Sequence, residues 1–178
     1  MTVMSKRRTV DSGRLPCNTH RYIQLGSKKK LYLWYPAQVR KFRISSKTEV
    51  QRYPIPPVLI KLIFENGILD TTHLWATSSS FLRTYNPPLY YFPYGNVYSD
   101  SRLCWGNVKY KEDYSPSSVD YNVSLIFTSS YNDDLGRNIG TFGYGHRDLT
   151  SLDHLKNLKD KDVFPEEQLI RHIFLSEA

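Results

Sequence analysis

Asn96 and Cys104 are the residues of this sequence whose types and spacing point most directly to chemistry. The cysteine follows the asparagine by eight positions, across the short segment Val97–Leu103. A cysteine thiolate can attack a carbonyl carbon and then carry the acyl group as a thioester. An asparagine amide close to that thioester can donate a hydrogen bond to the oxyanion or hold the surrounding loop. The alternative is that Cys104, with Leu103 and Trp105 beside it, is a small buried apolar residue.

The histidines and the second cysteine bear on which chemistry is open to Cys104. A cysteine hydrolase needs a base beside the thiol, and none of the five histidines lies close to Cys104 in the sequence. His73 falls in a predicted strand and is expected to be structural. The histidines show no metal-ligand spacing, and two cysteines alone cannot supply a four-ligand zinc site. We therefore expect no metal ion and no cofactor, and we interpret Cys17 as a bystander.

Length, composition and charge bound the class of protein. A chain of 178 residues, 40% of them hydrophobic, fits one folded domain, and its net charge is +7. The basic residues gather in the N-terminal quarter, which is typical of a solvated surface; nucleic acid is an alternative partner that we do not favour. No stretch has the features of a signal peptide or a membrane span. We therefore expect a cytoplasmic protein with reduced thiols and no membrane partner.

The segments before Cys104 must position it, and their pattern indicates strands. Residues 31–35 and 39–44 predict two strands that a proline separates. Residues 58–65 predict a strand with one apolar face, made by Val58, Ile60, Leu62 and Phe64, and with Lys61 and Glu65 on the other face. An Asn-Gly turn then leads into a returning antiparallel strand at residues 68–77.

The segments after Cys104 indicate helices. A serine and a following proline supply a favourable N-cap and first position for a helix at residues 116–130. Shorter helical segments are predicted to begin near residues 152 and 164.

This order of strands and then helices predicts an α+β domain. We expect an antiparallel meander sheet of about four strands followed by helices. Residues 1–25 are assigned to a basic N-terminal extension, and residues 26–178 to the catalytic domain.

The segment Tyr94–Trp105 resembles the active-site segment of ubiquitin-conjugating E2 enzymes, in which a cysteine follows the asparagine of a His-Pro-Asn tripeptide by eight residues. Over roughly residues 31–170 the chain is similar to the prokaryotic E2-like family D. That family includes protein B of PRTRC plasmid systems and E2-like proteins of bacterial ubiquitin-like conjugation operons. Here Tyr94 and Gly95 replace the His and Pro, and Ser101 stands where the family commonly has glycine. The segments that carry the similarity are residues 53–59, 88–90, 93, 96–97, 104–108 and 164–166.

The resemblance implies a ubiquitin-conjugating (UBC)-like fold, with its N-terminal helix reduced or absent, and the activity of an E2-type transferase. Such an enzyme accepts a ubiquitin-like protein from an E1-like enzyme as a thioester on Cys104 and passes it to an amine or another nucleophile. Asn96 would support the oxyanion or the loop. No strong local base is needed, because the thioester is already activated. The acidic residues that could orient the incoming amine are Asp100, Asp133 and Asp134.

The resemblance also implies partners and leaves alternatives open. The partners are an E1-like activating enzyme, a ubiquitin-like modifier and, where the operon encodes one, a JAB-type protease. Such operons serve plasmid maintenance or defence against phage. One alternative is a catalytically silent E2-like module that only binds a ubiquitin-like protein. Another is a nucleic-acid-binding domain, in which the basic N-terminal quarter would dominate.

Overall fold

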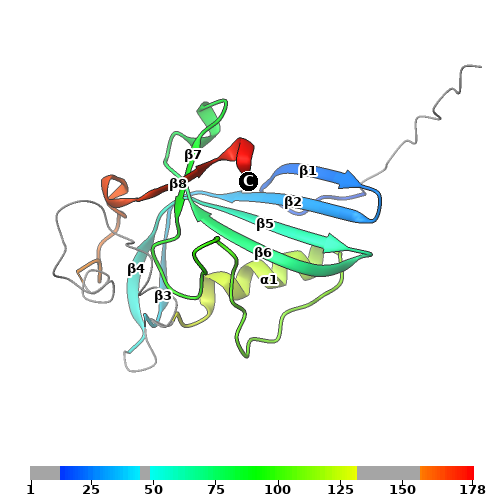
Figure 1. Cartoon of the computed structure of the whole chain (residues 1–178). Helices are drawn as coiled ribbons and strands as arrows, with labels where there is room; N and C mark the ends of the chain where they lie inside the picture. The colour runs from blue at the N-terminus through cyan, green and yellow to red at the C-terminus, as the bar shows by residue number, and fades with distance from the viewer. Residues whose placement is uncertain (1–12, 45–48, 132–156) are drawn as a thin grey trace, which may run out of the picture.

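The computed structural model describes residues 13–44, 49–131 and 157–178. These residues form a six-stranded antiparallel sheet in the order β1-β2-β5-β6-β7-β8, a separate two-stranded sheet of β3 and β4, and one α-helix (Figure 1). The described fold is therefore α+β, as predicted. The elements are β1 Thr19–Leu25, β2 Lys28–Tyr35, β3 Gln38–Phe42, β4 Gln51–Ile55, β5 Val58–Glu65, β6 Ile68–Ala76, β7 Pro88–Tyr91, α1 Pro116–Thr128 and β8 Arg171–Phe174, with 3-10 turns η1 Phe81–Arg83, η3 Glu166–Gln168 and η4 Leu175–Glu177.

Strand β5 lies inside the sheet and is buried on both of its faces. Ile60, Leu62 and Phe64 belong to the large apolar cluster that includes α1, as their alternation predicted. Lys61 lies on the other face of β5, yet it is only 7% exposed. The reason is that the C-terminal segment covers this second face, and the Lys61 ammonium donates a hydrogen bond to the carbonyl of Ala178.

The predicted turn between β5 and β6 is confirmed. Asn66 and Gly67 have φ angles of +54° and +82°, the left-handed conformations that Asn and Gly adopt most readily. The chain then returns antiparallel as β6, which places His73 directly opposite Lys61.

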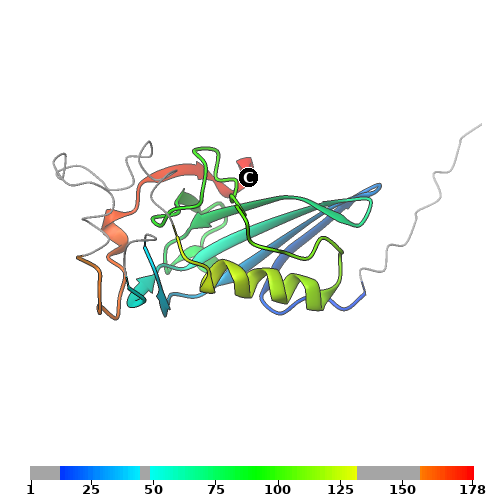
Figure 2. The same cartoon turned by 90° about the horizontal axis from the view of Figure 1, so that it is seen from below.

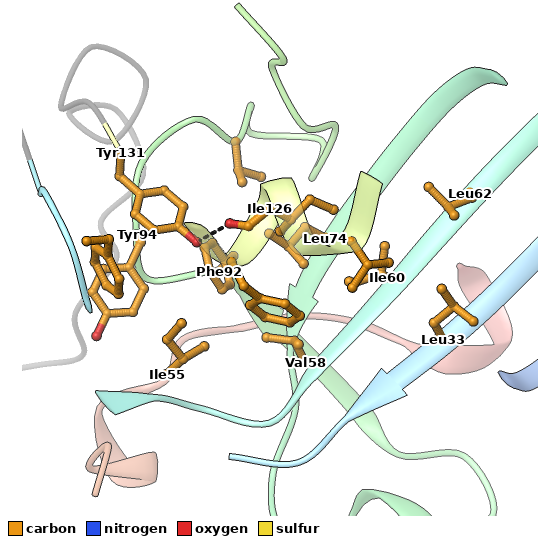
Figure 3. Close-up of a cluster of buried hydrophobic side chains, with 14 of the residues drawn as sticks. Leu33, Ile55, Val58, Ile60, Leu62, Leu74, Phe92, Tyr94, Ile126 and Tyr131 are labelled. Atoms are coloured by element: carbon orange, nitrogen blue, oxygen red, sulfur yellow. Dashed lines mark hydrogen bonds between the residues drawn. The ribbon is translucent and has the colours of Figure 1, made fainter. Parts of the chain in front are cut away.

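Helix α1 begins and runs as the sequence predicted. The Ser115 hydroxyl accepts a hydrogen bond from the backbone N–H of Ser118, and Pro116 occupies the first turn. The helix lies across one face of the sheet (Figure 2). Its residue Val119 belongs to the large apolar cluster, as does Ile126 (Figure 3). Within the described residues, no helix is both long and apolar enough to cross a membrane.

The second face of the sheet has a smaller apolar cluster of its own. Its buried members are Tyr32, Leu59, Trp75, Phe81 and Leu89. Residues from η1, β7, β8 and η4 pack here, so the turn after β6 and the C-terminal segment supply the cover. The sheet thus separates two apolar cores of unequal size.

Several sequence expectations differ from the structure. The described sheet has six strands rather than about four: β1 adds on one side of the predicted strands and β7 and β8 on the other, whereas β3 pairs with β4 in a separate sheet. Strand β1 lies within the range assigned to the N-terminal extension, and pairs with β2. The C-terminal part supplies a strand, β8, and 3-10 turns where we expected helices. The helix predicted from residue 152 falls largely outside the described residues.

Candidate functional site

Residues 96–104 fold into a short hairpin, called here the Cys104 hairpin. The backbone N–H of Cys104 donates to the carbonyl of Asn96 at 2.7 Å, and Val97 forms an antiparallel bridge with Leu103. Tyr98 N–H donates to the Arg102 carbonyl at 2.8 Å. The two ends of this segment, eight residues apart in sequence, therefore lie side by side on the two arms of the hairpin.

The hairpin is an additional neighbour of β6. Leu74 N–H donates to the Ser101 carbonyl at 2.9 Å, and Leu103 N–H donates to the Thr72 carbonyl at 2.7 Å. Strand β7 pairs with β6 only at Trp75 and Ala76, so the edge of β6 before them is open to the hairpin. The sheet thereby fixes the position of the segment that carries Cys104.

Ser101 forms the turn of the hairpin in a conformation that is unusual for serine. Its φ angle is +66°, in the left-handed region that costs a residue with a Cβ atom roughly 1–2 kcal/mol. Its side chain is fully buried, and its hydroxyl has no hydrogen-bond partner among the described residues. Both observations explain why glycine would suit this position.

Tyr94 anchors the chain just before the hairpin. It is buried in an aromatic cluster, with its ring centroid 5.0 Å from that of Phe42 and 5.6 Å from that of Tyr131 (Figure 3). Its hydroxyl donates to the carbonyl of Pro54 on β4. Burial raises the pKa of Tyr94 well above its ordinary value, so the phenol remains a donor. An aromatic anchor thus holds the chain immediately before the hairpin.

The Asn96 side chain links the hairpin to the segment that follows α1. Its Nδ2 donates to the carbonyl of Ser130 at 3.0 Å, just after the end of α1. Its own backbone carbonyl receives the Cys104 N–H, and its φ angle is +66°. This geometry fits the loop-supporting role that we predicted for Asn96. The role itself stays a prediction.

Cys104 has a neighbour that the sequence reasoning missed. Its thiol is partly exposed and free of any disulfide. The Tyr98 hydroxyl lies close enough to interact with the sulfur, and this interaction raises the pKa of Tyr98. The hairpin register could have indicated the contact, because Tyr98 and Cys104 are diagonal neighbours on one face when Val97 pairs with Leu103.

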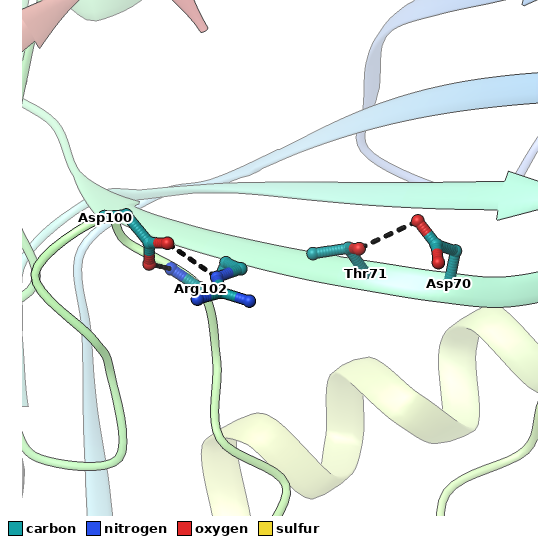
Figure 4. A network of polar contacts seen from close by, with 4 residues as sticks. All are labelled: Asp70, Thr71, Asp100 and Arg102. Atoms are coloured by element: carbon teal, nitrogen blue, oxygen red, sulfur yellow. Dashed lines mark hydrogen bonds and ion pairs between the residues drawn. The ribbon is translucent and has the colours of Figure 1, made fainter.

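Asp100 is held by Arg102 at the tip of the hairpin (Figure 4). Arg102 Nε lies 2.6 Å from Oδ2 of the carboxylate, and the Arg102 backbone N–H donates to Oδ1 at 3.1 Å. Burial raises the pKa of Asp100, but these hydrogen bonds from Arg102 outweigh it, so the pKa lies below its ordinary value. Its predicted role toward an incoming amine is untested, and Asp133 and Asp134 lie outside the described residues.

Two histidines that are distant in sequence lie near Asp100. His73 forms an antiparallel bridge with Arg102, and burial lowers the pKa of its imidazole below the ordinary value. The His172 ring stacks on Tyr91 with centroids 4.2 Å apart. Burial lowers the pKa of His172, and the nearby Asp100 carboxylate partly offsets this by raising it. In the described part of the chain, no three His, Cys, Asp or Glu side chains form a group that could hold a metal ion.

Comparison with known proteins gives one match. The model of a family described as prokaryotic E2 family D matches residues 1–172. No curated protein matches the chain, and no solved structure does. The match covers nearly the whole sequence and includes the Cys104 hairpin, β6 and α1.

Proposed function

Because this chain belongs to prokaryotic E2 family D, we propose that it is an E2-type conjugating enzyme. It carries a ubiquitin-like protein as a thioester on Cys104, receives it from an E1-like activating enzyme and passes it to an amine or another nucleophile. The observation that carries this proposal is the Cys104 hairpin. It holds a partly exposed free thiol at the edge of a rigid sheet, with the Asn96 carbonyl bonded to the Cys104 N–H at 2.7 Å.

The chemistry proceeds in two acyl transfers. The Cys104 thiolate attacks the carbonyl carbon of the thioester on the activating enzyme, a new C–S bond forms, and the activating enzyme's thiolate leaves. An acceptor amine then attacks the same carbon, the amide bond forms, and the Cys104 thiolate leaves while the amine loses a proton to solvent. The Tyr98 hydroxyl interacts with the sulfur, and in this mechanism it presents a donor to the thiolate before the first transfer and after the second.

The rest of the domain supports this function by positioning. We propose that the antiparallel sheet and α1 form a UBC-like fold, in which the chain between β7 and α1 holds the thioester. The thioester arrives already activated, so the enzyme acts mainly by orienting it, and effective molarity is a large source of rate. The basic N-terminal extension would contact the modifier or the activating enzyme.

A gel assay tests the proposal. The protein is mixed with the E1-like enzyme and the ubiquitin-like protein of its own operon and with ATP, then separated without reductant. We expect an adduct that reductant removes, that persists in Cys17→Ser and that is lost in Cys104→Ala.

Absence of this adduct, with an E1 that demonstrably activates the modifier, would sink the proposal. Coelution of the protein with the unconjugated modifier in that case would support the catalytically silent binding module instead.

A further inference from the structure

The chain that leaves Cys104 is fixed at both of its ends. Residues 105–114, called here the return segment, run beside α1 to the start of the helix (Figure 2). Before the cysteine, backbone hydrogen bonds join the Cys104 hairpin to β6. At the far end of the return segment, the Tyr114 N–H donates to the Gly67 carbonyl at 3.0 Å. Between these ends, side chains of α1 hold the segment.

The side chains of α1 contact alternate residues of the return segment. The Ser118 hydroxyl donates to the Asp113 carboxylate, whose two oxygens lie 2.8 and 2.7 Å away. One helical turn later, Asn122 contacts the backbone of Lys111. A spacing of two residues is that of an extended chain with one side toward its neighbour. The return segment therefore lies extended against the helix and is held at regular intervals.

Asn122 holds the segment by two hydrogen bonds to one residue. Its Oδ1 accepts the Lys111 backbone N–H at 2.8 Å, and its Nδ2 donates to the Lys111 carbonyl at 2.7 Å. The side chain is fully buried, and its helix neighbours Val119 and Ile126 belong to the large apolar cluster. A polar amide among apolar side chains is tolerated only while its hydrogen bonds are made. Because both backbone groups of Lys111 are engaged, the position and the direction of the chain are fixed there.

The contact at Lys111 reaches Cys104 through the intervening turn. Tyr110, which precedes Lys111, stacks on Trp105 with ring centroids 4.9 Å apart and planes 25° from parallel. The Val108 N–H closes the turn by donating to the Trp105 carbonyl at 3.0 Å. Trp105 directly follows Cys104. This stacked and hydrogen-bonded turn connects the residue that α1 holds to the residue that carries the thiol.

We propose that Asn122 is a positioning residue for Cys104: its buried amide holds Lys111, and the stacked turn before Lys111 fixes the chain on the C-terminal side of the cysteine. The Cys104 hairpin fixes the chain on the other side. With both sides held, an acyl group on the sulfur keeps one orientation, which is a large source of rate for an activated thioester. The consequence for acyl transfer rests on the proposed function, whereas the consequence for the return segment does not.

Three variants in a Cys17→Ser background separate the Asn122 amide from the stability of the helix. Asn122→Leu replaces the amide by an apolar side chain of the same branched shape and removes both hydrogen bonds. Tyr110→Leu breaks the stack on Trp105 and leaves those two bonds in place. Val123→Ala is the matched control, because it removes buried apolar surface at the next position of α1 and keeps the amide.

Hydrogen exchange tests the contact at Lys111 without any partner protein. In the parent, the Lys111 amide should exchange at least roughly tenfold more slowly than that of Lys109, whose N–H has no hydrogen bond within the described residues. We expect Asn122→Leu to remove at least roughly this factor, and Val123→Ala to stay within about twofold of the parent. Equal exchange at the two lysine amides of the parent would overturn the proposal, even if Asn122→Leu did not fold.

Fluorescence tests whether the contact reaches the residue beside the cysteine. Acrylamide quenching of Trp105 is taken as the difference between each protein and its Trp105→Phe counterpart. We expect quenching to increase in Asn122→Leu and in Tyr110→Leu, because the indole loses its packed partner, and to stay as in the parent in Val123→Ala. Unchanged quenching in Asn122→Leu would overturn the proposal. An equal increase in Val123→Ala would reduce Asn122 to a residue that only stabilises the helix.

A last measurement addresses transfer. Protein loaded with the modifier is mixed with free lysine, and the second-order rate constant is followed against pH. We expect Asn122→Leu and Tyr110→Leu to lower it roughly 3- to 10-fold with an unchanged pH profile, since orientation changes and no titrating group does. Val123→Ala should stay within about twofold of the parent.

Rate constants equal to the parent's in both Asn122→Leu and Tyr110→Leu would contradict the role in transfer. If no thioester forms in the parent, the proposed function fails. Exchange and fluorescence then still decide whether Asn122 positions the return segment.

Discussion

At the scale of single residues, Ser101 carries the clearest cost in the site. Its left-handed backbone and its buried unpartnered hydroxyl both destabilise the folded state. We expect Ser101→Gly to raise the free energy of unfolding by about 1 kcal/mol, after the greater entropy of glycine in the unfolded chain is deducted. Urea denaturation measures the change. The control is Ser99→Gly, an exposed position in the same hairpin without a positive φ, which should lower stability.

Tyr98 is the residue whose contact with the Cys104 sulfur can be tested without any partner protein. Tyr98→Phe removes the hydroxyl dipole that interacts with the Cys104 sulfur. Because the side chain is 40% exposed, folding should be unaffected. We expect alkylation of Cys104 by iodoacetamide, in a Cys17→Ser background, to slow by about two- to fivefold. Tyr85→Phe, at a fully exposed tyrosine, should leave the rate unchanged; equal rates in Tyr98→Phe and the parent would contradict the prediction.

The sequence alone predicted part of this site. Asn96 and Cys104 could be paired because a hairpin joins residues that are close in sequence. The places of Tyr98 and His73 beside this segment were not predicted, because they depend on the register between backbone segments. His73 meets the hairpin through a contact between distant segments, and the types of the residues give no direct sign of it.

At the scale of elements, the start of α1 offers a further test. The Ser115 hydroxyl accepts the Ser118 N–H at 3.2 Å, so Ser115→Ala should lower the free energy of unfolding by about 1 kcal/mol in urea denaturation. Ser124→Ala is the matched control. Its hydroxyl donates to a carbonyl one turn earlier on the exposed side of the helix, and alanine favours helix there. A Ser115→Ala protein as stable as Ser124→Ala would show that the cap contributes little.

The elements divide into those that the sequence could predict and those that it could not. The β5–β6 hairpin and α1 were predicted because apolar periodicity and local turn or capping residues coincide there. Strands β1 and β8 were missed: they are edge strands, and partners elsewhere in the sheet stabilise them. The burial of Lys61 could not be predicted either, because the segment that covers its face of the sheet is distant in sequence.

At the scale of the whole molecule, burial of Lys61 makes stability depend on pH. Burial, followed by the charges of Lys30 and Lys28, lowers the pKa of Lys61 from 10.5 to about 8. Between these values the unfolded chain binds more protons than the folded one, so stability rises with pH. We expect the urea midpoint of the parent to rise from about pH 8 to about pH 9.5, and that of Lys61→Met to stay flat.

The exposed Lys109 provides the control for this experiment. The urea midpoint of Lys109→Met should rise with pH as it does in the parent. The range stops below pH 10 because burial raises the pKa of tyrosines such as Tyr94, and stability is lost as the unfolded chain ionises above the ordinary tyrosine value of 10.0. A urea midpoint of the parent that does not change with pH would contradict this prediction, and would show that the folded protein stabilises the Lys61 ammonium.

The division of the protein by its sheet into two apolar cores has a consequence for combined mutations. Val123 belongs to the core beneath α1, and Phe81 belongs to the core on the opposite face. Side chains without shared partners contribute independently, so the losses from Val123→Ala and Phe81→Ala should sum within about 0.5 kcal/mol in the double mutant. The two sides of the sheet can therefore accumulate changes separately, and thermodynamic epistasis should be concentrated within each side.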